Sequence, residues 1–256
     1  MGDSGVGRGA PVAIVNGASR GIGFETARTL IGAGYRVCIT GRKADSLQSS
    51  MARLEGEGGT VLAVAGASQD PEHQADVVST VLEEWSRVDV LVNNAATSPF
   101  LGDLLDAEPK HLDRAWAVNV AAPWSWSKRV VHEYMGEHGG TIVNMASIGG
   151  TYPVPRVGVY NVTKAALIHM TRQLALELAP KIRVNAIAPA TIKTEFARAK
   201  YDGREQEVAG QFPLQRLGSP EEVADVVLLL CNGKLGWITG QTVVIDGGAS
   251  LIQGVV

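Results

Sequence analysis

The sequence has few of the features that mark secreted, membrane or nucleic-acid-binding proteins. Its 256 residues include only two cysteines, Cys38 and Cys231, so we interpret both as buried small apolar residues and expect no disulfide or metal site. The net charge is -3, with no basic block that would attract nucleic acid. No apolar run approaches the roughly 20 residues of a membrane span.

Targeting signals are also missing from the first ten residues, MGDSGVGRGA. They lack the apolar centre of a signal peptide. The chain starts Met-Gly, but Val6 stands where the myristoylation pattern needs Ser or Thr. We therefore expect a cytoplasmic protein with no membrane or nucleic-acid partner.

Short apolar runs alternate with amphipathic stretches along the whole chain. Apolar residues make up 45% and charged residues 19%, enough for a large core. The runs are Val12–Val15, Val37–Thr40, Val61–Ala65, Val88–Val92, Thr141–Met145, Ile182–Ile187 and Thr242–Ile245. Most are continuously apolar, as in parallel strands buried on both faces. The pattern predicts one domain, 1–256, of the α/β class: a doubly wound, Rossmann-like, seven-stranded parallel sheet with helices on both faces.

Two helices between these runs show clear signals. From Glu72 to Trp85, the apolar residues Ala75, Val78, Val81, Leu82 and Trp85 share one stripe. At 219–222, the sequence Ser-Pro-Glu-Glu starts a second helix with a capping serine, a proline in the first turn and acidic residues at the positive end.

The stretch NGASRGIG, residues 16–23, follows the first predicted strand. Gly17, Gly21 and Gly23 are spaced like a phosphate-binding loop, but not in the G-x-G-x-x-G order of the common dinucleotide fingerprint. A flexible turn is the alternative interpretation, because a chain with 30 glycines produces such spacings by chance. The position between a strand and a helix favours a cofactor site, since backbone N–H groups and the helix dipole meet an anion there.

Polar residues with a shared chemistry follow other predicted strands. NNAA (93–96) follows the fourth strand and Ser147 the fifth. Tyr160 and Lys164 are four residues apart, so they lie on one helical face. A phenol has a reference pKa of about 10, and a nearby ammonium favours its charged form. Histidine, the base of a hydrolase triad, is absent from these positions.

These motifs resemble the short-chain dehydrogenase/reductase family, in its compact single-domain branch, and the likeness spans essentially the whole chain. The family loop T-G-x-x-x-G-x-G has Asn16 in its Thr position here. The resemblance implies that Asn119, Ser147, Tyr160 and Lys164 are catalytic. Tyr160 would exchange the proton, Lys164 would bind the nicotinamide ribose and lower the tyrosine pKa, Ser147 would orient the carbonyl and Asn119 would hold a water.

The resemblance also implies a cofactor site, with NADP(H) as the expected cofactor. After the second strand stand Gly41, Arg42 and Lys43, with no acid to repel a 2′-phosphate, and Arg20 approaches the same ribose. The expected contacts are Gly17, Ser19, Arg20, Gly21, Ile22, Gly23, Arg42, Asn94, Ala95, Tyr160, Lys164, Pro189, Ile192 and Thr194.

The sequence departs from the family pattern at three places. Ala96 and Ala190 stand where the family usually has glycine. The acid that commonly contacts adenine is missing, and Gly66, Ala67 and Ser68 occupy that stretch. None of these departures touches the catalytic four.

The sequence specifies the substrate less closely than it specifies the cofactor. We expect a lid at about 191–217, whose mixed charges indicate a solvated cover rather than a cationic patch and favour a moderately apolar carbonyl over a strongly anionic one. The candidate pocket residues are Pro99, Phe100, Tyr152, Pro153, Val154, Phe196 and Tyr201. We expect a ketone or secondary alcohol, with an acyl-carrier thioester as one possibility, and a homotetramer. The alternative function is a non-catalytic cofactor sensor or scaffold on the same fold.

Overall fold

The computed structural model describes residues 9–252. Residues 1–8, on which the expectations about targeting signals mainly depend, lie outside the described residues. Among the described residues, no helix has the length and apolar character needed to cross a membrane.

A seven-stranded sheet forms the centre of the molecule, with every neighbouring pair of strands parallel. The strand order is β3-β2-β1-β4-β5-β6-β7. The strands are β1 (Val12–Val15), β2 (Arg36–Gly41), β3 (Val61–Ala65), β4 (Val90–Asn93), β5 (Gly140–Met145), β6 (Ile182–Pro189) and β7 (Thr242–Ile245). The order turns back between β1 and β4, which confirms the predicted doubly wound fold.

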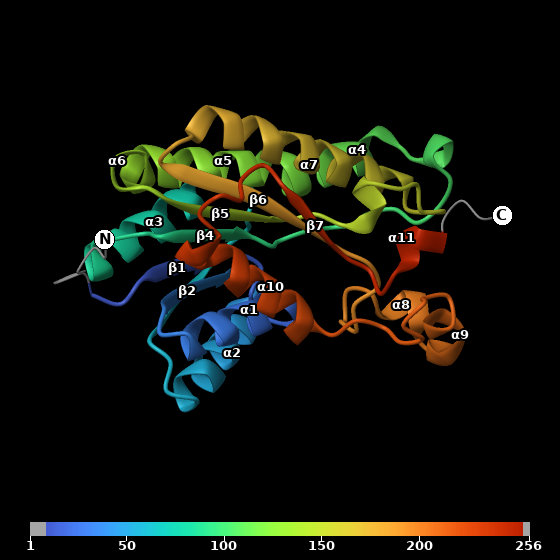
Figure 1. The fold of residues 1–256 in the computed structure, drawn as a ribbon, viewed down its shortest axis with the longest axis horizontal. Helices are drawn as coiled ribbons and strands as arrows, with labels where there is room; N and C mark the ends of the chain where they lie inside the picture. Colours follow the sequence, from blue (N-terminus) through green and yellow to red (C-terminus); the bar gives the residue numbers. More distant parts are fainter. Residues whose placement is uncertain (1–8, 253–256) are drawn as a thin grey trace.

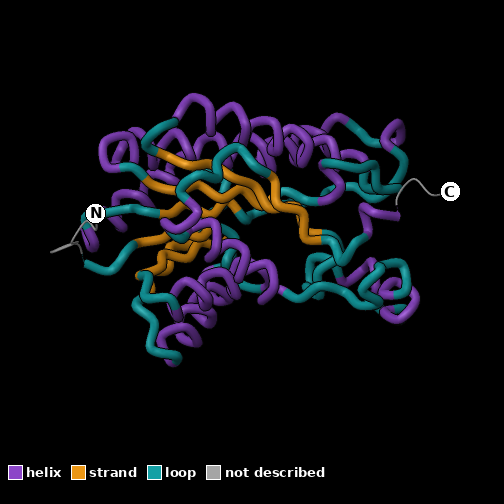
Figure 2. The backbone as a smooth tube through the Cα atoms, in the orientation of Figure 1, coloured by secondary structure: helices purple, strands orange, loops and turns teal. Residues whose placement is uncertain are grey.

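Helices cover both faces of the sheet (Figures 1 and 2). Helices α1, α2 and α10 lie below the sheet in Figure 1, and α5 and α7 lie above it. Helix α3 packs on the same face as α5. The α-helices are α1 (Gly21–Gly32), α2 (Ala44–Gly56), α3 (Pro71–Trp85), α4 (Pro109–Trp116), α5 (Ala122–Val130), α6 (Gly136–His138), α7 (Gly158–Leu178), α8 (Arg198–Tyr201), α9 (Glu205–Ala209), α10 (Pro220–Cys231) and α11 (Ala249–Ile252).

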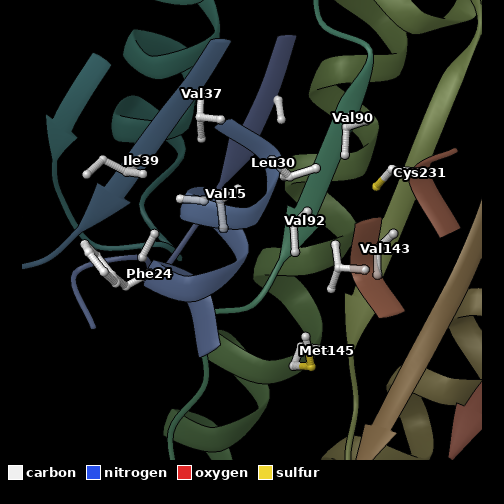
Figure 3. Packing of buried hydrophobic residues seen from close by; sticks show 14 of the residues in the cluster. Val15, Phe24, Leu30, Val37, Ile39, Val90, Val92, Val143, Met145 and Cys231 are labelled. Carbon is white, nitrogen blue, oxygen red and sulfur yellow. The ribbon is translucent and has the colours of Figure 1, made fainter. Parts of the chain in front are cut away.

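Strand β1 shows why its apolar run is continuous. Ala13 and Val15 point into the core beneath α1, α2 and α10, part of which Figure 3 shows. Val12 and Ile14 point into the core beneath α3, α5 and α7. Because successive strand residues face opposite sides, a sheet covered on both sides needs apolar residues at every position.

Two helix predictions have different outcomes. At α10, Ser219 Oγ accepts a hydrogen bond from Glu222 N, and the Glu222 carboxylate accepts one from Ser219 N, so the predicted cap is confirmed. On α3, the buried face is wider than the predicted stripe and includes His73, Gln74 and Val77. Polar residues are accommodated there because Gln74 bonds Ser68 O and the Ser125 hydroxyl.

Strand β4 begins at Val90, two residues after the start of the predicted run at Val88. Val88 is buried but lies before the parallel ladder. Asp89 accounts for the late start, because its carboxylate accepts a hydrogen bond from Val12 N and pairs with Arg87. The lid segment follows β6 and carries α8 and α9, which lie together beyond the carboxyl end of the sheet (Figure 1).

Candidate active site

The glycine loop between β1 and α1 requires glycine for both conformation and space. Gly17 and Gly21 have φ angles of 66° and 56°, which side chains rarely adopt. A Cβ on Gly17 would lie 2.8 Å from Ala95 Cα. A Cβ on Gly23 would lie 2.5 Å from both Asn94 Nδ2 and Gly17 O. The loop is therefore a specific tight structure rather than a merely flexible turn.

Two asparagines hold this loop against the end of β4. Asn16 Oδ1 accepts hydrogen bonds from Asn94 N at 2.8 Å and from Ala95 N at 2.7 Å. In return, Asn94 Nδ2 donates to Gly17 O at 2.9 Å. Asn16 is 1% exposed, so these bonds are shielded from water. Asparagine in the family's threonine position thus connects two strand ends at the point where the strand order reverses.

One cavity collects the predicted cofactor residues at the carboxyl edge of the sheet. It runs along the glycine loop, the end of β2, the loop after β4 and the segment after β6. Every predicted cofactor contact lines it: Gly17, Ser19, Arg20, Gly21, Ile22, Gly23, Arg42, Asn94, Ala95, Tyr160, Lys164, Pro189, Ile192 and Thr194. Ser147 lines the same cavity, as do the atypical Ala96 and Ala190. Asn119 does not belong to its lining.

Helix α7 presents Tyr160 and Lys164 on one face. Lys164 Nζ lies 5.5 Å from the centre of the Tyr160 ring. Burial raises the pKa of Tyr160 to about 12, while its interaction with the Ser147 hydroxyl acts in the opposite direction. Burial also lowers the pKa of Lys164 to about 7. In the protein alone, desolvation therefore dominates, and the tyrosine pKa is not lowered as the resemblance implied.

Ser147 follows β5 and caps a short 3₁₀ turn, Ile148–Gly150. Its Oγ accepts a hydrogen bond from Gly149 N at 3.2 Å. This bond restricts the rotamer of Ser147. The residue lies just after the end of a central strand and not in a long loop. The hydroxyl proton stays available for a carbonyl oxygen placed beside Tyr160.

Asn119 has a different position from the other three. It lies in the π-helical turn Ala117–Ala121 and is fully buried. Its Nδ2 donates to Thr97 O and Thr163 Oγ1, both at 2.9 Å, and its Oδ1 accepts from Thr97 N at 2.8 Å. The side chain therefore joins the loop after β4 to α7. Its part in the reaction stays a prediction.

Comparison with known proteins agrees with this geometry. A family model described as "Enoyl-(Acyl carrier protein) reductase" matches residues 17–250. Dehydrogenase/reductase SDR family member 4 of Homo sapiens is 40% identical over 97% of this chain and 92% of its own length. The chain belongs to the short-chain dehydrogenase/reductase family. The same family member of Oryctolagus cuniculus is 41% identical, over 97% of this chain and 98% of its own.

Solved structures of short-chain dehydrogenase/reductases share the fold. A variant of actinorhodin polyketide ketoreductase, solved with NADPH, superimposes with a TM-score of 0.90 at 29% identity, over 94% of this chain and 97% of its own. ElxO, solved with NADP, gives a TM-score of 0.88 at 29% identity, over 94% of this chain and 99% of its own.

Several cavity residues were not anticipated from the sequence. The lining includes Ser68 and Gln69, which follow β3, and Arg114 and Val118 from α4 and the turn after it. Arg114 and Val118 are four residues apart on adjoining helical turns, a spacing that could have indicated a shared face. The loop that lacks the usual acid is held in place, because Trp126 Nε1 donates to Ser68 O at 3.0 Å.

Most of the candidate substrate-pocket residues lie outside the cofactor cavity, and their contact with a substrate stays a prediction. Of the seven candidates Pro99, Phe100, Tyr152, Pro153, Val154, Phe196 and Tyr201, only Phe196 lines the cavity. The Phe100 ring instead stacks on His111, with ring centres 4.9 Å apart. The Tyr201 hydroxyl donates back to Thr194 O at 3.1 Å. Phe100 and Tyr201 therefore have local partners outside the cavity or in the backbone, which the sequence does not reveal.

Proposed function

We propose that this short-chain dehydrogenase/reductase is an NADP(H)-dependent oxidoreductase that transfers a hydride between nicotinamide and a ketone or secondary alcohol. The observation that carries the proposal is the single cavity shared by the glycine loop, Arg42 and the Ser147–Tyr160–Lys164 group. Two similar structures were solved with NADPH or NADP, which supports the same cofactor here.

The residues of the cavity fit a dinucleotide with a 2′-phosphate. Positive φ angles at Gly17 and Gly21 bring the backbone close to an anion at the start of α1. Arg20 and Arg42 line the cavity where β2 ends, and Gly41 stands where an NAD enzyme has a carboxylate. Two guanidinium groups suit a phosphate because each makes forked, charge-assisted hydrogen bonds.

The catalytic chemistry follows from the same residues. When bound, the nicotinamide supplies or accepts the hydride. Tyr160, with its pKa raised by burial, stays protonated near neutral pH and donates its proton to the carbonyl oxygen during reduction. Ser147 donates a hydrogen bond to the same oxygen and orients it. In the opposite direction Tyr160 must lose its proton to accept that of the alcohol, and positive charge on Lys164 favours this.

A panel of carbonyl compounds tests this function. Ketones, aldehydes and 3-oxoacyl thioesters should be offered with NADPH and with NADH, and loss of the reduced nicotinamide absorbance recorded. We expect turnover with NADPH for at least one ketone. The sensor or scaffold alternative predicts NADPH binding without hydride transfer to any carbonyl or from any alcohol. Tyr160→Phe protein in parallel assays identifies turnover that comes from the proposed site.

We also infer that the protein is a homotetramer. Large apolar side chains are exposed on α4 and α5, among them Leu112, Trp116 and Trp124, and also on β7 and α11, among them Val244 and Leu251. Exposed apolar residues on separate elements are candidates for the two twofold contacts that a tetramer needs. Light scattering should give about four times the chain mass. A monomer at micromolar concentration would contradict this inference.

A further inference from the structure

The lid segment 191–217 carries five cationic side chains, and four of them are paired with acids. Lys193 pairs with Glu205, Arg198 with Glu195, Arg204 with Glu207 and Arg216 with Glu222, at distances of 2.5, 3.2, 3.7 and 2.6 Å. The fifth, Lys200, forms no ion pair with any of residues 9–252. Its charge is therefore not neutralised by the lid itself.

Lys200 lines the cofactor cavity on the lid turn that also carries Phe196. Phe196, four residues earlier, lines the same cavity. Tight turns connect the two residues, with Lys200 N donating to Ala197 O at 2.8 Å. The Phe196 ring centre lies 6.1 Å from that of Tyr160. The lid turn that carries Phe196 and Lys200 therefore lies beside the reactive phenol.

The part of the lid at Thr194, and not the part at Lys200, lies next to the proposed site for the dinucleotide phosphates. Thr194 packs against the glycine loop, where a Cβ on Gly21 would lie 3.3 Å from Thr194 Cγ2. The start of α1 and Arg20 are on that side. Lys164 also lines the cavity, and one of its three donors is used by Met145 O. Among the cations of the lid, Lys200 is the one that lines the cavity and forms no ion pair within residues 9–252.

The charge balance of the cavity favours an anion. Its described lining contains five cationic residues, Arg20, Arg42, Arg114, Lys164 and Lys200, against one carboxylate, Glu195. Glu195 is paired with Arg198 outside the lining. Lys200 is exposed, so its ammonium group is accessible to a ligand, although nearby protein still lowers its pKa through desolvation. Pairing with an anionic ligand would favour the charged form of the lysine.

We propose that Lys200 determines substrate specificity by pairing with an anionic oxygen group, a carboxylate or a phosphate, on the carbonyl substrate. The proposal rests on the proposed function, because it assigns the substrate end of the same cavity. The substrate class is a ketone with an acidic substituent separated from the reacting carbon. Reduction itself is unchanged: the hydride goes to the carbonyl carbon and the Tyr160 proton to its oxygen.

The test compares matched substrates, aliphatic oxo acids of increasing length and their methyl esters, in wild type and variants. Lys200→Gln removes the charge, Lys200→Arg keeps it, and Lys193→Gln is the control, since Lys193 is paired and does not line the cavity. Wild type should prefer at least one acid over its ester. Lys200→Gln should reduce kcat/KM for that acid by about tenfold or more, mainly through KM, and leave the ester unchanged.

Further readouts separate this proposal from the other possibilities. Lys200→Arg should keep the acid preference, and Lys193→Gln should behave like wild type. An NADPH affinity reduced tenfold in Lys200→Gln would overturn the proposal, because Lys200 would then serve the cofactor. An equal acid-to-ester ratio in wild type and Lys200→Gln would also overturn it, while turnover of the esters would leave the proposed function intact. If no substrate receives a hydride, both the proposed oxidoreductase function and the role of Lys200 are wrong.

Discussion

Lys164 Nζ donates a 2.6 Å hydrogen bond to the carbonyl oxygen of Met145, the last residue of β5. The lysine side chain is 1% exposed, so this bond ties helix α7 to the central sheet in the absence of water. An ammonium group has three donors. Two donors of Lys164 therefore remain, and the bond to the strand end restricts the position of its ammonium group.

Tyr160→Phe should abolish turnover and leave NADPH binding nearly intact. The phenolic oxygen is the group that we propose to exchange a proton with the substrate, while the proposed cofactor contacts are mostly with the glycine loop and the arginines that line the cavity. Turnover and NADPH affinity should be measured on the same preparation. Tyr134→Phe is a suitable control, because Tyr134 stacks on His138 outside the cavity. Activity within a few-fold of wild type would exclude Tyr160 as the acid.

Lys164→Met should abolish or strongly reduce turnover and yet raise stability at pH 6.5. Burial lowers the Lys164 pKa from 10.5 to about 7, so holding a proton on this lysine opposes folding. Below about pH 7 both folded and unfolded chains carry the proton, and the full penalty applies. Between about pH 7 and 10.5 only the unfolded chain carries it, so the penalty decreases as pH rises.

Melting temperatures of wild type and Lys164→Met at several pH values check this expectation. The advantage of the variant should be largest near pH 6.5 and should shrink toward pH 10. Lys181→Met is the matched control, since Lys181 is an exposed lysine that also donates to a backbone carbonyl, Gly136 O. A difference that does not vary with pH would contradict a lowered Lys164 pKa.

Arg42→Asp should move cofactor preference from NADP(H) toward NAD(H). Loss of one arginine–phosphate contact should weaken NADPH binding by roughly 10- to 150-fold, with little effect on NADH. The measurement is kcat/KM for both cofactors in wild type and variant. Lys43→Asp makes the same charge reversal one residue away but outside the cavity lining. A wild type that prefers NADH by tenfold would refute the assignment.

Cofactor binding should protect the lid from hydrogen exchange. Segment 191–217 contains only the short helices α8 and α9, and its Thr194 lies against Gly21 of the phosphate loop. A bound dinucleotide would add contacts along that surface and order the segment. Amides of β5, in the buried centre of the sheet, serve as the internal reference. Equal exchange of the lid with and without NADPH would exclude closure on the cofactor.

Much of the fold and cofactor site was predictable because the relevant signals are local. Continuous apolar runs specify strands buried on both faces, and the predicted strands all occur, with β4 starting two residues late. Glycine spacing between a strand and a helix indicated the loop, since Gly17 and Gly21 need φ values that other residues avoid. Ser147, Tyr160 and Lys164 were placed correctly because each follows a strand end or shares one helical face.

Only the tertiary structure decided which other side chains share the cavity. The sequence does not distinguish Phe100, Phe196 and Tyr201 as pocket candidates. In the structure Phe100 stacks on His111 and Tyr201 donates a hydrogen bond to Thr194 O, and only Phe196 lines the cavity. The same holds for the lid, where four of the five cations form ion pairs and Lys200 forms none within the described residues. Backbone conformation and helix phase are encoded by neighbouring residues, whereas pairing depends on contacts between distant or loop residues that form only when the chain folds.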